Sequence, residues 1–295
     1  MNNFLQVLQS DKILLSDGST GVELQNRGLP PEKNPAEYNI SHPQIVQQLH
    51  KEYFEAGSDI VETNTFGGNR ISLGHYDLQN RVGEISTKSA ELVRGVCPPD
   101  RFVAGSVGPT GEILEPLGTM TTQDCYDVFA EQVEALAQAG VDVIFVETMM
   151  AAEEAEIAIQ VVKERTELPV VATMTFEKGN VGLRTQWGVD IATAVARLSQ
   201  VGADVIGSNC GRGFDEMIEI IEEMRPLTTK PIIAQSNAGI PESVNGVSVY
   251  KETPEWIVPK AEKLLQLGVN ILGGCCGTGP DHIRKMRSLV DKFNC

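Results

Sequence analysis

The chain has 295 residues, of which 41% are hydrophobic and 22% are charged, and its formal net charge at pH 7 is −16. This composition is typical of a globular protein, and the acidic balance argues against nucleic acid or an anionic membrane as partner, because both attract clustered Lys and Arg. No run reaches the roughly 18 apolar residues of a membrane span, and the polar start lacks a signal peptide's basic-then-apolar order, so we expect a cytoplasmic location.

Short runs rich in Val and Ile, each ending in a polar or glycine-rich tip, occur eight times along the chain. Continuous apolar runs of this length are typical of strands that are buried on both faces of a parallel sheet. The eight predicted strands lie within residues 12–21, 59–68, 102–111, 141–149, 169–179, 204–213, 231–239 and 269–279.

Helical patterns, with apolar residues at three- and four-residue spacing, lie between these runs. We expect Thr121 or Thr122 to cap the second of them, Pro259 to kink or shorten the fourth, and Pro280 to stand in the first turn of the last. Residues 22–42 and 67–80 are predicted as longer loops, which would lie over the mouth of a barrel if the strands form one. The predicted helices cover residues 43–57, 121–140, 188–202, 253–268 and 279–293.

Eight strands that alternate with helices predict a single (β/α)₈ TIM barrel, with residues 1–295 forming one domain; an open doubly wound sheet is the alternative. In such a barrel the functional residues gather at the carboxyl ends of the strands. No lysine lies inside a strand, as a Schiff-base aldolase would require, and the nearest candidate, Lys178, is already in a loop. The polar residues predicted at the strand tips are Asp17, Glu62, Thr63, Asn64, Glu147, Asn209, Cys210, Asn237, Cys275 and Cys276.

Three of the six cysteines are expected to meet at these tips. Cys210 ends the sixth predicted strand, and Cys275 and Cys276 end the eighth, so their thiolates could hold a Zn²⁺ ion and leave its fourth position open. A vicinal disulfide and inert buried thiols are alternatives. A further alternative is a phosphate-binding loop at "GGCCGTG", which would make the chain a barrel lyase or aldolase. The remaining cysteines, Cys97, Cys125 and Cys295, are interpreted as small buried hydrophobic residues.

Five motifs, in order along the whole chain, carry a resemblance to a known family. "GGCCGTGPDHI" together with "GSNC" at 207–210, and "LLSDGSTGVELQNRG" at 14–28, resemble the homocysteine S-methyltransferase family. "ETNTFGGN" at 62–69 is similar to the second-strand signature of its cobalamin-dependent methionine synthase branch, and "VET" at 146–148 and "SNAG" at 236–239 also fit. The resemblance implies a zinc enzyme that transfers a methyl group to the thiol of homocysteine and so makes methionine.

The resemblance also implies roles for individual residues. Asp17 and Glu147 would hold the amino group of homocysteine, and the backbone around Gly18 and Ser19 would meet its carboxylate. Asn237 is similar to a residue near the metal that fills the open position when substrate is absent. Glu62 is either functional or a member of a buried ion pair. The implied zinc ligands are Cys210, Cys275 and Cys276, and the second-strand residues Thr63 and Asn64 are further candidates for substrate contact.

The methyl donor is expected to be a separate molecule. These residues contain no second barrel for folate and no Asp-x-His-x-x-Gly corrinoid motif, since the four histidines read "SHP", "LHK", "GHY" and "DHI". We therefore expect methylcobalamin on a separate corrinoid protein. The alternative is S-methylmethionine or betaine, which would need an aromatic pocket for a small cation. Only Phe66, Phe176 and Trp187 follow strand tips closely.

Overall fold

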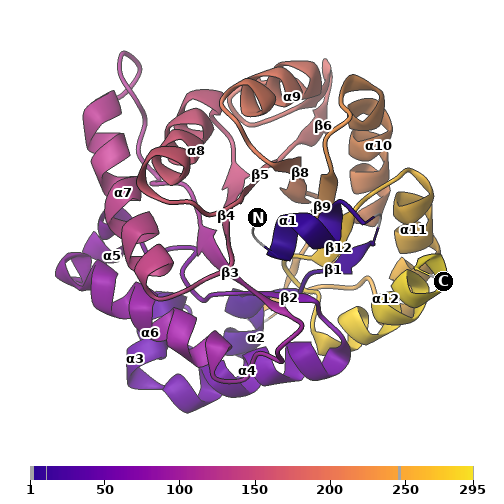
Figure 1. The fold of residues 1–295 in the computed structure, drawn as a ribbon, viewed down its shortest axis with the longest axis horizontal. Coiled ribbons are helices and arrows are strands. Elements are labelled where there is room, and N and C mark those ends of the chain that lie inside the picture. Colours follow the sequence, from indigo (N-terminus) through magenta and orange to yellow (C-terminus); the bar gives the residue numbers. More distant parts are fainter. Residues whose placement is uncertain (1–2, 11, 245–246, 295) are drawn as a thin grey trace.

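The computed structural model describes residues 3–10, 12–244 and 247–294, and its central feature is a barrel of eight parallel strands inside a ring of helices (Figure 1). The hydrogen-bonded order is β1-β12-β9-β8-β5-β4-β3-β2, and a parallel bridge between Ser16 and Ile60 joins the two ends. This confirms the predicted (β/α)₈ barrel over the open sheet. The barrel strands are β1 (Leu14–Leu15), β2 (Ile60–Glu62), β3 (Phe102–Val107), β4 (Val143–Met149), β5 (Val170–Met174), β8 (Val205–Cys210), β9 (Ile232–Ser236) and β12 (Ile271–Gly274).

One major helix follows each of the eight barrel strands along the chain. After β1 and β2, shorter helices come before the major one. As predicted, Thr121 caps its helix by accepting a bond from Asp124 N, and Pro280 begins the last helix. Three of the outer helices, α6, α8 and α10, were not among those predicted. The major helices are α4 (Pro43–Ala56), α6 (Val82–Arg94), α7 (Thr122–Gln138), α8 (Ala152–Arg165), α9 (Ile191–Gln200), α10 (Phe214–Met224), α11 (Pro254–Gln266) and α12 (Pro280–Phe293).

Pro259 does not shorten its helix. Helix α11 continues through this residue to Gln266. The proline ring lies on the exposed side of the helix, where the carbonyl that loses its N–H partner can bond to water. The exposed position therefore reduces one part of the cost that a proline has inside a helix, the carbonyl left without an N–H partner.

The two segments predicted as loops contain short helices. Side-chain caps from Ser19, Asn34 and Asn69 start three of them, and each is too short to show an apolar period in the sequence. The segment 22–42 overlaps α2 (Thr20–Asn26), η1 (Pro35–Glu37) and α3 (Tyr38–Ser41), and the segment 67–80 contains α5 (Arg70–Gly74) and the start of η2 (Gln79–Arg81).

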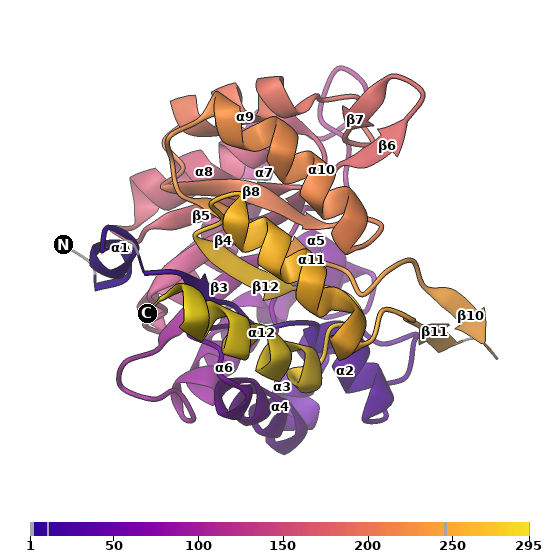
Figure 2. The same cartoon turned by 90° about the vertical axis from the view of Figure 1, so that its right-hand side faces the viewer.

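Two small hairpins extend beyond the carboxyl ends of the strands. One pairs β6 (Glu177–Gly179) with β7 (Gly182–Arg184), and the other pairs β10 (Glu242–Val244) with β11 (Val247–Val249). Both project from the same end of the molecule, opposite the N-terminus (Figure 2). They therefore flank the end of the barrel at which the polar tips lie.

The other end of the barrel is closed by helix α1 (Asn3–Leu8), which crosses the middle of the ring in Figure 1. Phe4 is fully buried and packs edge-on against Phe102, with ring centroids 5.4 Å apart. Phe4 and Leu8 belong to an apolar cluster with inward-facing strand residues. The interior is therefore filled with hydrocarbon at this end.

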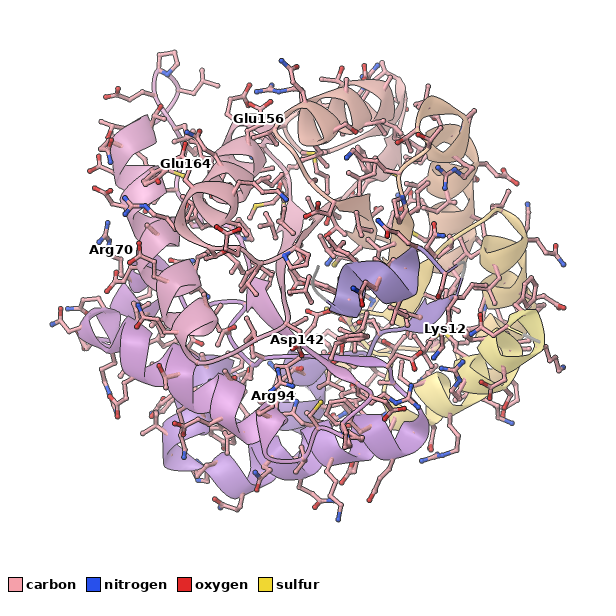
Figure 3. The ribbon with its side chains drawn as sticks, in the orientation of Figure 1. Lys12, Arg70, Arg94, Asp142, Glu156 and Glu164 are labelled. Carbon is pink, nitrogen blue, oxygen red and sulfur yellow. The ribbon has the colours of Figure 1, made fainter. Side chains whose placement is uncertain are left out.

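Charged side chains cover the outside of the helix ring (Figure 3). Arg94 on α6 donates to the carboxylate of Asp142 at 2.7 Å, and the same carboxylate accepts a bond from Val103 N at 2.8 Å, so the pair ties α6 to the starts of β3 and β4. Across the described ranges, we find no helix with the length and apolar character of a membrane span.

Candidate metal and substrate site

One layer of inward-facing side chains is polar, and each strand contributes one residue to it or just beyond it. Successive residues of a strand face opposite sides, so the residues two positions earlier face inward too, and most of those belong to the apolar cluster under α1. The interior thus changes from apolar to polar within a single layer. The polar layer consists of Ser16, Glu62, Ser106, Glu147, Thr173, Asn209, Gln235 and the backbone of Gly273.

Three cysteine sulfurs converge just above this layer. The sulfur atoms of Cys210, Cys275 and Cys276 all lie within 4.8 Å of one another, as the sequence predicted. Cys210 ends β8 in the left-handed region, with φ 67°, and β12 stops at Gly274 before the vicinal pair. Ending both strands frees the side chains from strict alternation, so two adjacent cysteines can serve one centre.

Hydrogen bonds link the three cysteine side chains to one another. All three cysteines are free in this structure, so no vicinal disulfide joins Cys275 and Cys276 in it. Hydrogen bonds from the thiols of Cys275 and Cys276 lower the pKa of Cys210, and their donation to that sulfur raises the pKa of Cys275. The cluster therefore stabilises a thiolate without any basic side chain.

Two neighbouring side chains hold the cysteines in place. Asn237 accepts a bond from Cys276 N at 2.9 Å, and its amide donates to Gly211 O at 2.6 Å and to the Cys210 sulfur. The hydroxyl of Tyr250 is hydrogen-bonded to the Cys276 thiol. Asn237 was predicted near the sulfurs, whereas Tyr250, which follows β11, carried no signal in the sequence.

Three buried carboxyl groups lie in or beside the polar layer. Glu147 accepts bonds from Ser106 Oγ and from Asn209 Nδ2, the latter at 3.2 Å, and is also hydrogen-bonded to Glu62. Gln235 donates to Glu62 at 2.6 Å. Asp17 accepts a bond from the Glu62 N–H at 2.9 Å. Glu62 thus bonds to an amide and another carboxyl group, and does not form the buried ion pair that was one interpretation of it.

Burial raises the pKa of all three carboxyl groups. It is the largest cause for each, and it raises the pKa of Asp17 to about 7, with the charge of Glu147 adding to it. A hydrogen bond between Glu62 and Glu147 requires a proton on one of them. A cluster of this kind favours a positively charged group, because a cation would relieve the repulsion between the carboxylates.

The first strand tip is fastened to the cysteine loop through Thr278. Ser19 N donates to Thr278 O at 2.9 Å, and the buried Tyr53 hydroxyl donates to both Ser19 O and Thr278 O. Only glycine fits at position 18, because a Cβ there would collide with the Thr278 carbonyl. The loops that carry Asp17 and Cys275 therefore form one packed unit.

Two predicted substrate residues have their polar groups engaged in bracing the chain. Both amide hydrogens of Asn64 are used, on Pro35 O at 2.7 Å and Asn39 Oδ1 at 3.0 Å. The hydroxyl of Thr63 pairs with that of Thr65 at 2.6 Å and accepts a bond from Ser106 N. The structure does not bring either side chain to the sulfurs, and their contact with substrate stays a prediction.

Sequence reasoning missed the polar partners inside the strands. Ser106, Thr173 and Gln235 each lie two residues after an inward apolar residue, so strand alternation could have placed them in the mouth. Among the cysteines outside the cluster, Cys125 is buried as predicted and Cys97 is only partly buried. The prediction for Cys295 lies outside the described residues.

Comparison with known proteins agrees with this site. The family model described as homocysteine S-methyltransferase matches residues 14–290. Curated relatives include two proteins named methionine synthase, from Mycobacterium leprae (strain TN), 31% identical over 97% of this chain, and from Mycobacterium tuberculosis (strain ATCC 25618 / H37Rv), 32% identical over 98%. The chain spans about a quarter of the length of each, since it covers 25% of both relatives.

Solved structures of the homocysteine methyltransferase MmuM from Escherichia coli share the fold. The metallated form matches with a TM-score of 0.79 and 20% identity over 96% of this chain and 98% of that one. The oxidized form matches with a TM-score of 0.81 and 22% identity over 97% and 99%. With the family model covering nearly the whole barrel, the chain belongs to the homocysteine S-methyltransferase family.

Proposed function

We propose that this chain is a zinc-dependent methyltransferase that transfers a methyl group to the thiol of homocysteine and so forms methionine, with residues 1–295 acting as a single homocysteine-binding domain. The observation that carries the proposal is the convergence of three sulfurs above buried carboxyl groups at one end of the barrel. Homocysteine has a thiol for the sulfur centre and an ammonium group for the carboxylates. Family membership supports the same reading.

Cys210, Cys275 and Cys276 would hold the zinc ion. Three sulfur donors suit Zn²⁺ and leave a position for a fourth ligand. Bound zinc would favour the thiolate form of the substrate sulfur, whose pKa as a free thiol is near 8.5. Asn237 and Tyr250 would keep the ligand sulfurs oriented through the bonds described above.

Asp17 and Glu147 would take the ammonium group of homocysteine. Ser106 and Asn209 fix the Glu147 carboxylate, so the incoming cation meets a preset acceptor. The backbone around Gly18 and Ser19 would meet the substrate carboxylate. Held this way, the amino acid lies in the polar layer and its sulfur points outward toward the methyl donor.

For the donor, we favour methylcobalamin on a separate corrinoid protein. The second-strand motif "ETNTFGGN" supports this choice. Of the three aromatic residues near the strand tips, Phe176 is fully buried, while Phe66 and Trp187 are 45% and 48% exposed and follow different strands. These three therefore do not enclose a small cation.

Tyr250 favours a second candidate donor, a small sulfonium or betaine. Its hydroxyl contacts Cys276, so an aromatic ring lies beside the sulfurs. Tyr250 was not among the aromatic residues that the sequence placed near the strand tips. Purified protein should be assayed with homocysteine and, in turn, methylated corrinoid protein, methylcobalamin, S-methylmethionine and glycine betaine. Methionine formed only with the small donors would reject the corrinoid proposal, and methionine formed with none would reject the function.

The zinc centre gives a direct prediction. We expect one zinc per chain, and single substitutions of Cys210, Cys275 or Cys276 by Ala should abolish its retention, because each removes one of three sulfur ligands. Elemental analysis after dialysis measures this, and Cys97→Ala is the control that should keep its metal. Full zinc content in all three variants would contradict the assignment.

Homocysteine binding should also release about one proton at pH 7, because the metal would bind its sulfur as the thiolate. Calorimetry in buffers of different ionisation enthalpy measures this release.

A further inference from the structure

Asn209 uses the full hydrogen-bonding capacity of its side chain within the site. It lies in β8 beside Cys210 and is 1% exposed. Its Oδ1 accepts bonds from Thr148 N at 2.9 Å and Thr173 Oγ1 at 2.8 Å. Its Nδ2 donates to Thr148 Oγ1 at 2.7 Å and Glu147 Oε2 at 3.2 Å. Because Thr148 N can only donate, the orientation of the amide is fixed.

The backbone that Asn209 holds is strained. Thr148 has φ 60°, which is a rare conformation for a β-branched residue. The pairing of β4 with β5 shifts at the same place, since Val146 pairs with Ala172 but Met149 pairs with Met174, leaving one extra residue on β4. This bulge contains Glu147, so the side chain that points into the mouth stands on an irregular segment that needs support.

Asn209 also joins this segment to the metal side of the site. Its main chain leads directly into Cys210, whose φ is 67°, and its carbonyl accepts a bond from Thr175 Oγ1 at 3.1 Å. One residue therefore connects β4 with β8 across β5. The Asn209 side chain orients the Glu147 carboxylate through its hydrogen bond, and the Asn209 backbone leads into Cys210 and so affects its position.

We propose that Asn209 is a positioning residue that fixes the Glu147 carboxylate relative to the Cys210 sulfur, and so selects ligands whose ammonium group and thiol are spaced as in homocysteine. This assignment rests on the proposed function. Asn209 acts through Glu147 and Thr148 and does not itself touch the reacting sulfur.

The test compares two ligands that differ only in the amino group. Homocysteine and 4-mercaptobutanoate share the thiol and the carboxylate, so the ratio of their dissociation constants isolates the ammonium contact. Asn209→Leu keeps roughly the size of the side chain and removes the donor to Glu147, and it adds no charge that could itself attract the ammonium group. We expect the zinc-loaded variant to bind homocysteine about 10- to 100-fold more weakly, with 4-mercaptobutanoate affinity and zinc content unchanged.

Two further variants secure the result. Asn270→Leu makes the same chemical change at the opposite end of the barrel, where Asn270 Oδ1 accepts a bond from Ile232 N, and it should leave both affinities unchanged. If Asn209→Leu does not fold, Thr173→Val carries the test, because it removes one anchor of the Asn209 amide with little change in shape. It should weaken homocysteine binding selectively, by a smaller factor.

Calorimetric titration gives each outcome a distinct meaning. Equal weakening of both ligands, or no weakening of either, would overturn the positioning role while leaving the proposed function intact. Wild-type protein that binds zinc but not homocysteine would overturn the proposed function and this assignment with it.

Discussion

At the scale of single residues, Asp17 shows a conflict between stability and binding. Its carboxyl group is fully buried, and its pKa is raised to about 7, chiefly by burial and further by the Glu147 charge. A carboxyl group whose pKa is higher in the folded state stabilises the fold while it is protonated. That contribution is complete below the unfolded pKa, near 4, and is lost as the pH rises through about 7.

Asp17→Asn should therefore stabilise the protein only at higher pH. At pH 3.5 the wild-type carboxyl group is mostly protonated in both the folded and the unfolded state, so the variant should differ little. The difference should grow as the pH rises and reach about 2–4 kcal/mol at pH 8, because the amide carries no charge. Homocysteine binding should weaken at the same time, since the ammonium loses a partner. Urea unfolding at both pH values measures the first effect, and an identical difference at pH 3.5 and pH 8 would contradict it.

The convergence of the three sulfurs could be predicted from the sequence, but the direction of other side chains at the strand tips could not. Three cysteines at strand ends suffice to suggest a metal site, because thiolates are preferred zinc ligands. The ammonium-binding role of Asp17 and Glu147 follows only from the resemblance to the family and stays a prediction. Asn64 belongs to the same motif as Thr63, yet its amide is bonded to Pro35 and Asn39. The direction of a side chain at a strand tip depends on which loop residues pack against it. A single sequence does not reveal which loop residues these are.

At the scale of elements, the turn between β12 and α12 presents two of the three sulfurs. Thr278 closes it, with its hydroxyl donating to Cys275 O at 2.6 Å and its N–H donating to the same oxygen at 3.1 Å. The turn is also packed against Gly18 and Gly274, neither of which could carry a Cβ. The spacing of Cys275 from Cys210 therefore depends on Thr278.

Thr278→Val should lower zinc affinity about 10- to 100-fold while the protein stays folded, because it removes the hydroxyl that supports a ligand-bearing turn without changing the side-chain shape. Competition with a chromophoric chelator measures the affinity. Thr166→Val is the matched control: its hydroxyl bonds Val162 O at the end of α8, away from the sulfurs. Equal zinc affinity in wild type and Thr278→Val would show that the hydroxyl does not support the site.

The eight strands and five of the eight major helices could be predicted because their signals are repeated along the chain, whereas the long helices α6, α8 and α10 were missed. All eight strands and the cap at Thr121 follow from apolar runs and a capping residue. The short helices α2, α3 and α5 could not be, because four to seven residues do not complete two turns of a periodic pattern. The prediction that Pro259 would shorten its helix was wrong, since the sequence does not show that its ring faces solvent, and a kink there stays a prediction.

At the scale of the whole molecule, the core and the site are separate. The apolar clusters fill the space between helices and strands and the end under α1, whereas the sulfurs lie beyond the polar layer. Removing zinc should therefore leave the helical circular dichroism signal intact and lower the melting temperature by roughly 10 °C under conditions of a large zinc excess. Cys210→Ala, which lacks a ligand, should show no zinc-dependent shift. Loss of the helical signal on chelation would mean that the fold depends on the metal.

The closure of the barrel by α1 imposes a sequence of events on the reaction. Because Phe4 and Leu8 close one end, both reactants of the proposed reaction would have to enter through the mouth, and homocysteine would occupy the inner place. We expect homocysteine to bind first, the donor to cover it, and methionine to leave last. Initial-rate kinetics should then show methionine inhibiting competitively against homocysteine and non-competitively against the donor. Competition between methionine and the donor would show instead that the donor can enter an empty barrel. In the expected case, the closed end of the barrel determines the order in which the reactants bind and leave.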